Sequence, residues 1–342
     1  MAIISKAKIL LKVNTVLKNY LISSERGTNL PISYKDLCLF EDSIPLAEPN
    51  YDGIRWETLQ YNPEQAKDLH TGLVNMYAYL KADGDVTAME HLRIERLDQF
   101  IFGKTKPIRI KIVNPHNGNF DYFYIKIADA SRIYGLEIEH FLSPHRMNYL
   151  VGKDTILEEH IHGIPGDTFI LNHLTDKSLN TIQLAKEFVK FNERCWVRLL
   201  GDMHPGNFVV MATPDFEGVN YKIRSIDFDQ QSYEGKKAIY SPQSFKRNSP
   251  FVGLVSDHLD QQSIKQYQKE ERSLLAKRIR SSHSQIKKLT EAMARDVTSF
   301  PQNVDLLKAQ LAEHYKAKEF LTCKNMGEIF VMSLKQLFPK KS

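Results

Sequence analysis

Three polar side chains lie next to the ends of apolar stretches in the second half of the chain. Asp202 and Asn207 lie in the sequence GDMHPGN, between a predicted helix and an apolar strand, and Asp227 follows the next apolar run, in IDFD. A turn between the two runs would bring the second back beside the first, so the three side chains could converge. Carboxylate and amide oxygens suit Mg²⁺ bound to phosphates, and an aspartate that binds no metal can accept the proton of an attacking hydroxyl.

The surrounding elements must position these residues. Residues 179–200 carry the strongest helical pattern of the second half, and two apolar runs within 208–229 indicate a hairpin after it. Upstream, alternating runs at 107–114 and 120–128 flank the turn PHNGN and predict another hairpin. A helix at 130–142 and two further strands before HGIPG are expected to follow.

The order of these elements predicts an α+β fold with two lobes. We expect residues 1–90 to form a mainly helical N-terminal extension, with a clear helix at 62–82. Residues 91–162 should form a small antiparallel-sheet lobe with one helix, and residues 163–342 a mostly helical lobe. A two-lobed layout of this kind places a cleft between the lobes, which is a usual place for a ligand.

Composition limits the classes of protein to consider. The 342 residues are 42% hydrophobic and 25% charged, which is typical of a folded chain, and the net charge of +5 is weak evidence for nucleic acid but compatible with an anionic ligand. The three cysteines, Cys38, Cys195 and Cys323, are far apart and show no CxxC spacing, so we expect reduced thiols in a cytoplasmic protein, without a zinc site. No apolar run reaches the roughly 18–20 residues needed to cross a bilayer.

The two polar motifs resemble the catalytic loop and the metal-binding motif of the protein-kinase-like superfamily. GDMHPGN followed by IDFD is most similar to the aminoglycoside- and choline-type small-molecule kinases and to the atypical kinase-like family linked to quinone biosynthesis. The resemblance covers roughly residues 95–250. It implies Asp202 as the catalytic base, Asn207 as a metal ligand and Asp227 as the main metal ligand, with ATP and Mg²⁺ as cofactors.

The resemblance also implies nucleotide-binding residues upstream. The family places a phosphate-binding lysine on the third strand of the small lobe, which here is Lys126 in FYIKIA. It pairs that lysine with a glutamate of the next helix. Glu137 and Glu139 both qualify, and Glu137 is favoured because it falls within the apolar stripe. The stretch ILEEHIHGIPG resembles the last strand and the hinge, which would place Glu159 to Ile161 at the adenine base.

Several positions depart from the family pattern. Only Gly103 stands between the presumed first two strands, where a glycine-rich phosphate loop is usual, and Leu200 replaces a histidine of many relatives. Asp229 stands where protein kinases have glycine; it could be a second metal or water ligand, or pair with a nearby base. His204 is expected to brace the loop through the backbone rather than to act in the chemistry. The alternative for the loop as a whole is an ordinary turn, because Asp and Asn favour turns.

These features favour an ATP- and Mg²⁺-dependent phosphotransferase that moves the γ-phosphate to a hydroxyl acceptor. A small-molecule acceptor is preferred because the loop lacks the lysine that serine/threonine protein kinases place two residues after the aspartate. The acceptor site is expected from residues 230–251 and the C-terminal helices. An unusual protein kinase, a non-catalytic nucleotide-binding module and an enzyme that transfers AMP remain as alternatives.

Overall fold

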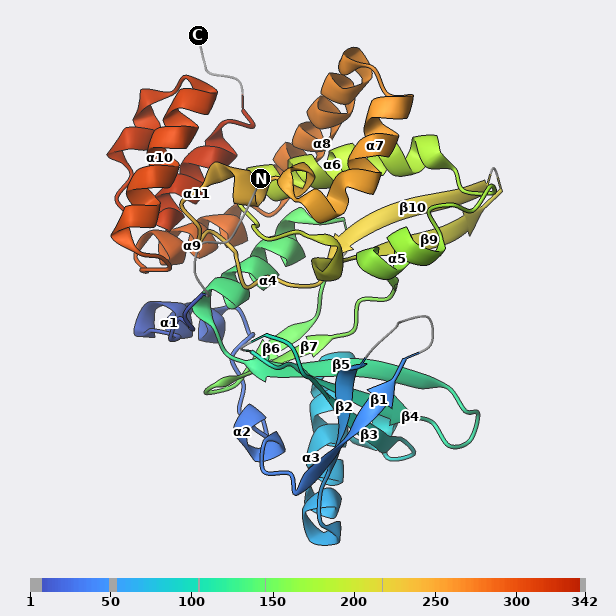
Figure 1. Cartoon of the computed structure of the whole chain (residues 1–342). Helices are drawn as coiled ribbons and strands as arrows, with labels where there is room; N and C mark the ends of the chain where they lie inside the picture. The colour runs from blue at the N-terminus through green and yellow to red at the C-terminus, as the bar shows by residue number, and fades with distance from the viewer. Residues whose placement is uncertain (1–7, 49–53, 104, 145, 217, 339–342) are drawn as a thin grey trace. The chain divides into compact units, whose positions relative to one another are not determined.

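The computed structural model describes residues 8–48, 54–103, 105–144, 146–216 and 218–338, which form an α+β fold (Figure 1). Contacts within the chain divide it into two compact units. The sheet unit comprises Lys18–Ala128 and Met147–His160. The helical unit comprises the described part of the chain up to Leu17, Asp129–Arg146 and the described residues from Ile161 onward. Each unit therefore contains segments that are distant in sequence.

The sheet unit contains a seven-stranded antiparallel sheet in the order β1-β2-β3-β4-β5-β7-β6. Helix α3 packs its apolar side against one face of this sheet, where a single core joins the helix to the central strands. The unit also contains the short helix α2 and the 3₁₀ turn η1, and most of α1. The bounds are α1 (Thr15–Ser23), α2 (Tyr34–Leu37), β1 (Asp42–Ala47), β2 (Ile54–Gln60), α3 (Pro63–Lys81), η1 (Thr87–Met89), β3 (Arg93–Phe100), β4 (Ile108–Val113), β5 (Phe120–Ile127), β6 (Tyr149–Val151) and β7 (Thr155–Glu159).

Local sequence explains the central part of this unit. The side chain of Asn62 accepts a hydrogen bond from the Gln65 amide and caps α3, with Pro63 in its first turn. In β4, Ile108 and Ile110 are fully buried and alternate with more exposed residues, as expected for a strand with one face on a core. The predicted helix at 62–82 and the hairpin of β4 and β5 are thus confirmed.

The prediction of a mainly helical stretch over residues 1–90 is wrong for residues 42–47 and 54–60. These residues form β1 and β2, and most of the expected extension belongs to the same compact unit as strands β3–β7. Strand β1 lies at the edge of the sheet, is largely exposed and contains Pro45, which an edge strand tolerates. An exposed edge strand has no regular apolar alternation, so the sequence carried little strand signal there. Gly103 consequently follows the third strand rather than the first, and Lys126 lies on the fifth strand.

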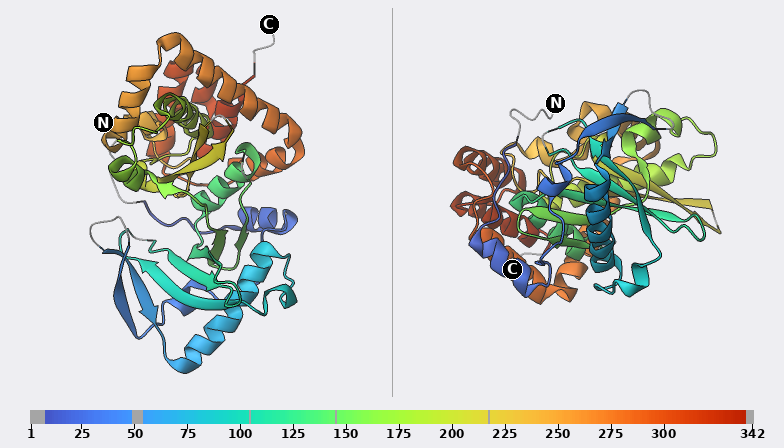
Figure 2. Two further views of the ribbon diagram at one scale, coloured as in Figure 1. Left: turned by 90° about the vertical axis from the view of Figure 1, so that its right-hand side faces the viewer. Right: turned by 90° about the horizontal axis from the view of Figure 1, so that it is seen from below.

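The helical unit is built around α6, which packs on α7, α8 and the hairpin of β9 and β10. A three-stranded sheet in the order β10-β9-β8 lies in this unit, and the C-terminal helices, orange to red, group together in each view (Figures 1 and 2). The helices are α4 (Ala130–Leu142), α5 (Gly166–Asn172), α6 (Thr181–Arg198), α7 (Ser249–His258), α8 (Gln261–Ser281), α9 (His283–Ala294), α10 (Pro301–Tyr315) and α11 (Met326–Lys335). The strands are β8 (Ile164–Pro165), β9 (Phe208–Asp215) and β10 (Gly218–Ser225), and 3₁₀ turns lie at Pro205–Asn207, Lys237–Tyr240, Pro242–Ser244, Lys246–Asn248 and Lys318–Thr322.

Aromatic side chains fix α6 against its neighbours. Phe188 of α6 stacks on Phe251 of α7 with ring centroids 5.2 Å apart, and Phe191 packs on Phe208 at 5.1 Å. These four rings are almost completely buried, so they anchor the helix that precedes the polar loop and the strand that follows it. The helices predicted at 130–142 and 179–200 are confirmed as α4 and α6. Among the described residues, no helix combines the length and the apolar character that crossing a membrane requires.

Candidate functional site

The polar loop begins where α6 ends. Leu199 caps the helix in the left-handed conformation, with φ of 52°, although this conformation usually belongs to glycine. Gly201 donates its amide hydrogen to the carbonyl of Gln230 at 3.1 Å. A Cβ at Gly201 would lie 2.9 Å from Ile239, so this glycine allows the close approach of two chain segments. The loop is therefore held against residues 230–239 from its first residue onward.

Asp202 takes an uncommon backbone conformation, with φ of 61°. Such a conformation costs a residue with a Cβ about 1–2 kcal/mol, although Asp tolerates it better than most. The Asp202 amide donates to the carbonyl of Ile239 at 3.1 Å, and its own carbonyl accepts hydrogen bonds from the His204 amide and the Asn207 side chain. These contacts hold an otherwise unfavourable conformation in place. Strain of this kind is often found at functional sites.

Two hydrogen bonds connect the residues of the polar loop to one another and to the end of the hairpin. The Asn207 amide nitrogen donates to the Asp202 carbonyl at 2.9 Å, and the Ile226 amide donates to the Asn207 carbonyl at 3.0 Å. Strands β9 and β10 pair in register, with Ser225 opposite Phe208. Asn207 and Asp227 therefore stand at the same end of the hairpin, one before β9 and the other after β10. The bond from Asn207 uses its amide nitrogen and leaves its amide oxygen as a group of the kind that Mg²⁺ binds.

Negative charge accumulates around Asp202. Burial raises the pKa of its carboxyl to about 7, and the carboxylates of Asp227, Glu234 and Asp229 act in the same direction. Arg247 opposes them more weakly. The pKa of Glu234 is also raised, again mainly by burial. A bound cation would reduce the repulsion between these carboxylates.

Arg132, near the start of α4, contacts both aspartates that follow β10. Its Nε donates to Asp229 Oδ1 at 2.7 Å, and one terminal nitrogen lies 3.6 Å from Asp227 Oδ1. Ser131 of the same helix donates its hydroxyl to the carbonyls of Asp229 and Gln231. The pairing of Asp229 with a nearby basic group is therefore present, and its role as a metal or water ligand stays a prediction. Sequence reasoning missed Arg132, because it is one of several charged residues in this helix and carried no distinctive signal.

His204 lies inside the loop and holds its turn. Its Nδ1 accepts a hydrogen bond from the Gly206 amide at 3.1 Å. Burial lowers the pKa of His204 to about 4, and the charge of Arg247 acts in the same direction, while Asp167 opposes it. The imidazole is therefore neutral near pH 7, as an acceptor at Nδ1 requires.

In the sheet unit, Lys126 forms an ion pair with a neighbouring strand. Its Nζ lies 2.6 Å from Glu158 Oε2 of β7, and both side chains are buried. The expected pairing of Lys126 with Glu137 joins the two units and stays a prediction. Glu137 is fully buried on α4, whereas Glu139 forms a buried ion pair with Arg198 of α6.

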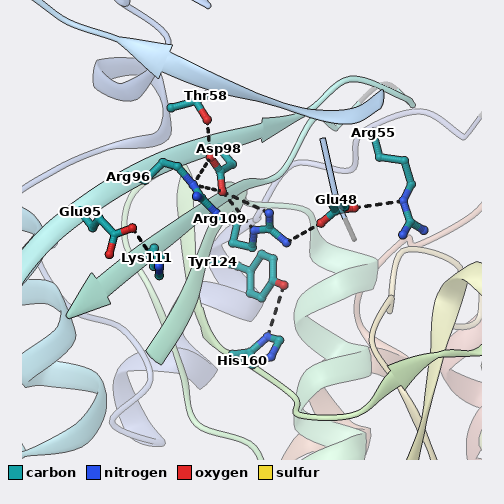
Figure 3. A network of polar contacts seen from close by, with 10 residues as sticks. All are labelled: Glu48, Arg55, Thr58, Glu95, Arg96, Asp98, Arg109, Lys111, Tyr124 and His160. Atoms are coloured by element: carbon teal, nitrogen blue, oxygen red, sulfur yellow. Dashed lines mark hydrogen bonds and ion pairs between the residues drawn. The ribbon is translucent and has the colours of Figure 1, made fainter. Parts of the chain in front are cut away.

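The same face of the sheet carries a network of charged and aromatic side chains (Figure 3). Arg109 bridges Asp98 and Glu48, each at 3.1 Å, and its guanidinium lies 4.2 Å from the centre of the Trp56 ring. Tyr124 of β5 contacts His160 through its hydroxyl at 3.3 Å. The charges in this network are largely paired within the sheet unit.

The expected hinge residues take part in local contacts. The Glu159 side chain accepts a hydrogen bond from the Asn148 amide at 2.8 Å, and the Glu159 amide donates to the Asn148 carbonyl at 3.1 Å. Ile161 is buried. Adenine binding by Glu159 to Ile161 stays a prediction that these contacts do not test.

The described residues contain no group of three or more His, Cys, Asp or Glu side chains arranged to hold a metal ion. The three cysteines are free thiols. The oxygen donors that could serve a metal are those of Asn207 and Asp227, a set that suits Mg²⁺ when phosphates and water complete it. No protein-family model matches this chain, and no curated protein sequence is significantly similar to it.

Proposed function

We propose that this chain is an ATP- and Mg²⁺-dependent phosphotransferase with a protein-kinase-like arrangement of two lobes. It transfers the γ-phosphate to a hydroxyl group, preferably of a small molecule. The observation that carries the proposal is the pair of hydrogen bonds that ties Asn207 to the Asp202 carbonyl and Ile226 to the Asn207 carbonyl. It gathers a general base and two oxygen ligands at one end of one hairpin.

Asp202 is the general base of the proposed reaction. The acceptor oxygen attacks the γ-phosphorus, its proton passes to the Asp202 carboxylate, and the bond from the γ-phosphorus to the bridging oxygen of ADP breaks. Asp202 is half-buried and lies near other carboxylates, and both conditions raise the pKa of its carboxyl and so favour proton acceptance. The backbone contacts of Asp202 keep its side chain at a fixed place on the loop.

Asn207 and Asp227 would hold Mg²⁺ through their side-chain oxygens. A bound Mg²⁺ neutralises charge on the transferring phosphates and orients them. Arg132 acts as a positioning residue, because its ion pair with Asp229 keeps that carboxylate close to α4. His204 holds the turn between Asp202 and Asn207.

Lys126 would contact the nucleotide phosphates, and Glu137, Glu159 and Ile161 would complete the nucleotide site, as the family resemblance implies. The ion pair with Glu158 of the neighbouring strand holds Lys126 Nζ in place within the sheet unit. This part of the proposal depends on the two units meeting as lobes.

One experiment tests the proposal directly. The purified chain is incubated with γ-labelled ATP and Mg²⁺, with and without a panel of hydroxyl-bearing metabolites, beside Asp202→Asn and Asp227→Asn. Labelled acceptor, labelled protein or released phosphate that both substitutions abolish supports the proposal. Unchanged activity in Asp202→Asn contradicts the assignment of the base.

The same experiment separates the alternatives. Label on the protein or on an added protein, rather than on a metabolite, identifies a protein kinase. Nucleotide binding without turnover identifies a non-catalytic module. Label that is transferred only from α-labelled ATP identifies AMP transfer.

A further inference from the structure

The helical unit contains a cavity that the proposed reaction does not use. Its volume is about 170 Å³, and it lies among the end of α4, one side of α6, the end of β10 and one side of α8. A cavity needs only about 10–15 Å³ to hold one water molecule. This cavity is therefore large enough for an anion of several atoms. Every residue that lines it belongs to the helical unit.

Cationic side chains dominate the walls of the cavity. Six cations from three elements line it: Lys190, Arg194 and Arg198 from α6, Lys222 and Arg224 from β10, and Arg278 from α8. Three glutamates also line it, Glu139, Glu187 and Glu271, so the lining carries an excess of three positive charges.

Two of the arginines already bind the three carboxylates. Arg198 pairs with Glu139. Arg194 lies 2.6 Å from Glu187 and 3.3 Å from Glu271. These two guanidiniums carry two positive charges against three carboxylates, and the other four cations bring the lining to its net excess of three. Lys190 also reaches Glu270 at 2.9 Å, and Lys222 lies 3.7 Å from Glu187.

Arg278 shows the effect of this imbalance. Its guanidinium donates a hydrogen bond to a neutral group, the carbonyl of Leu142, at 3.2 Å. Burial lowers the pKa of Arg278; the charges of Arg194 and Arg198 act in the same direction, and Glu271 and Glu139 oppose them. Both of these carboxylates already bind another arginine, so an anion in the cavity would add a counter-charge for Arg278.

Ser225 adds an independent sign that the cavity accepts a ligand. This residue ends β10, lines the cavity and is 1% exposed. Its hydroxyl is buried and has no hydrogen-bond partner among the described residues. A buried hydroxyl without a partner costs about 1–3 kcal/mol. A ligand oxygen in the cavity would supply the missing partner.

We infer that this cavity is a binding site for a phosphate group, either inorganic phosphate or the phosphate of a small monoester. Guanidinium groups bind tetrahedral oxyanions through paired N–H donors, and Arg224 and Arg278 face the cavity from different elements. Lys222 adds charge from the solvent side, since half of its side chain is exposed. Ser225 donates its hydroxyl from the floor of the site.

Calorimetric titration with sodium phosphate tests this inference on the full chain. The buffer contains EDTA and no Mg²⁺ or nucleotide, with chloride as the only other anion. We expect saturable binding at one site with a Kd in the millimolar range or tighter. Arg278→Gln should weaken binding at least tenfold, and Lys222→Gln about threefold, in line with the value of about 1.5–3 kcal/mol for a hydrogen bond to a charged group and less for an exposed ion pair.

Three controls locate the site. Lys277→Gln, at an exposed residue next to Arg278 on α8, should bind phosphate as the wild type does. Asp227→Asn should also retain binding, which separates this cavity from the polar loop. Arg278→Lys keeps the charge and, with melting curves recorded in chloride, shows that the loss in Arg278→Gln does not come from unfolding.

Several results would overturn the inference. One is the absence of saturable heat in the wild type up to tens of millimolar phosphate. Another is wild-type affinity for phosphate in both Arg278→Gln and Lys222→Gln. The third is a loss of phosphate binding in Asp227→Asn. A parallel titration with phenyl phosphate identifies the source of the phosphate. Tighter binding of the ester indicates a phosphate monoester as the ligand, and tighter binding of inorganic phosphate indicates the free ion.

Discussion

Two regions of the helical unit collect charge of opposite sign, although one strand serves both. The loop around Asp202 gathers carboxylates, with Arg132 and Arg247 as its nearby cations. The cavity between α6 and α8 gathers arginine and lysine in excess over glutamate. Strand β10 contributes Ser225 to the cavity, and Asp227 follows two residues later. An unbalanced charge indicates the charge of the expected ligand, so the first region suits a cation and the second an anion.

The network in the sheet unit provides the reference for this comparison. Arg109 lies between two carboxylates there, and Arg96 also reaches Asp98, at 2.8 Å (Figure 3). Positive and negative groups alternate, each cation drawn contacts a carboxylate, and the four cations exceed the three carboxylates by only one charge. A dense group of charged residues is therefore not sufficient evidence for a site. The net imbalance is the informative feature.

The largest effect should come from the negatively charged region. We expect Asp202→Asn to lower phosphotransfer by about 10²–10⁴-fold, the usual contribution of a general base. The amide keeps the shape of the side chain but cannot accept the proton. Turnover of γ-labelled ATP measures the change, and a parallel melting curve verifies the fold. Asp257→Asn, at an exposed residue near the end of α7, is the matched control and should leave the rate unchanged.

The next effect concerns the ion pair at the wall of the cationic region. Glu139→Gln should lower the free energy of unfolding by about 3–5 kcal/mol, because it leaves the buried Arg198 guanidinium without its carboxylate. Urea denaturation measures this. Glu270→Gln removes the partner of Lys190 from a partly exposed pair, and should cost less than about 1 kcal/mol. Equal losses in the two variants would contradict the view that burial makes the Glu139 pair different.

A smaller effect tests the charge balance around Asp227. Arg132→Gln should destabilise the chain by about 1.5–3 kcal/mol, since it removes a charged hydrogen bond to Asp229. Added Mg²⁺ should then raise the melting temperature more in the variant than in the wild type, because a ligand that binds the folded state stabilises it. Melting curves with and without Mg²⁺ measure both quantities. A variant that Mg²⁺ leaves unchanged would speak against a cation site in this loop.

The smallest effect concerns the buried hydroxyl of the cavity. In phosphate-free buffer, Ser225→Ala should leave the free energy of unfolding unchanged or raise it by up to about 1 kcal/mol, because no partner among the described residues is lost. Ser333→Ala is the matched control: this residue is equally buried, and its hydroxyl donates to the Val197 carbonyl at 3.0 Å. That variant should lose about 0.5–1.5 kcal/mol. A larger loss at Ser225 than at Ser333 would contradict an unsatisfied hydroxyl.

Local patterns in the sequence were sufficient for the elements that bury a regular apolar face. The alternation in β4 and β5, the capped helix α3 and the apolar stripe of α6 each follow from neighbouring residues. Strands β1 and β2 were missed, because an exposed edge strand and its neighbour lack that regularity. The cap of α6 also gives no sequence signal, because Leu199 takes the left-handed conformation that glycine usually takes.

Long-range partners were beyond the reach of local patterns. Arg132 meets Asp229 across 97 positions of the chain, and Lys126 meets Glu158 across 32. Neither pair leaves a periodic signal, because each depends on how separate elements pack. The candidate residues Asp202, Asn207 and Asp227 could be selected since they flank recognisable elements. Their surroundings, and the whole cationic cavity, required the structure.

The discontinuity of the helical unit has a consequence for how the chain can be divided and made. Helix α4 belongs to this unit, yet strands β6 and β7 follow it before the chain returns at Ile161. A fragment that begins after the sheet would lack α4, and with it the partners of Asp229 and Arg198. During synthesis, Glu139 leaves the ribosome 59 residues before Arg198, so the buried ion pair of α4 with α6 can form only after those residues have been made.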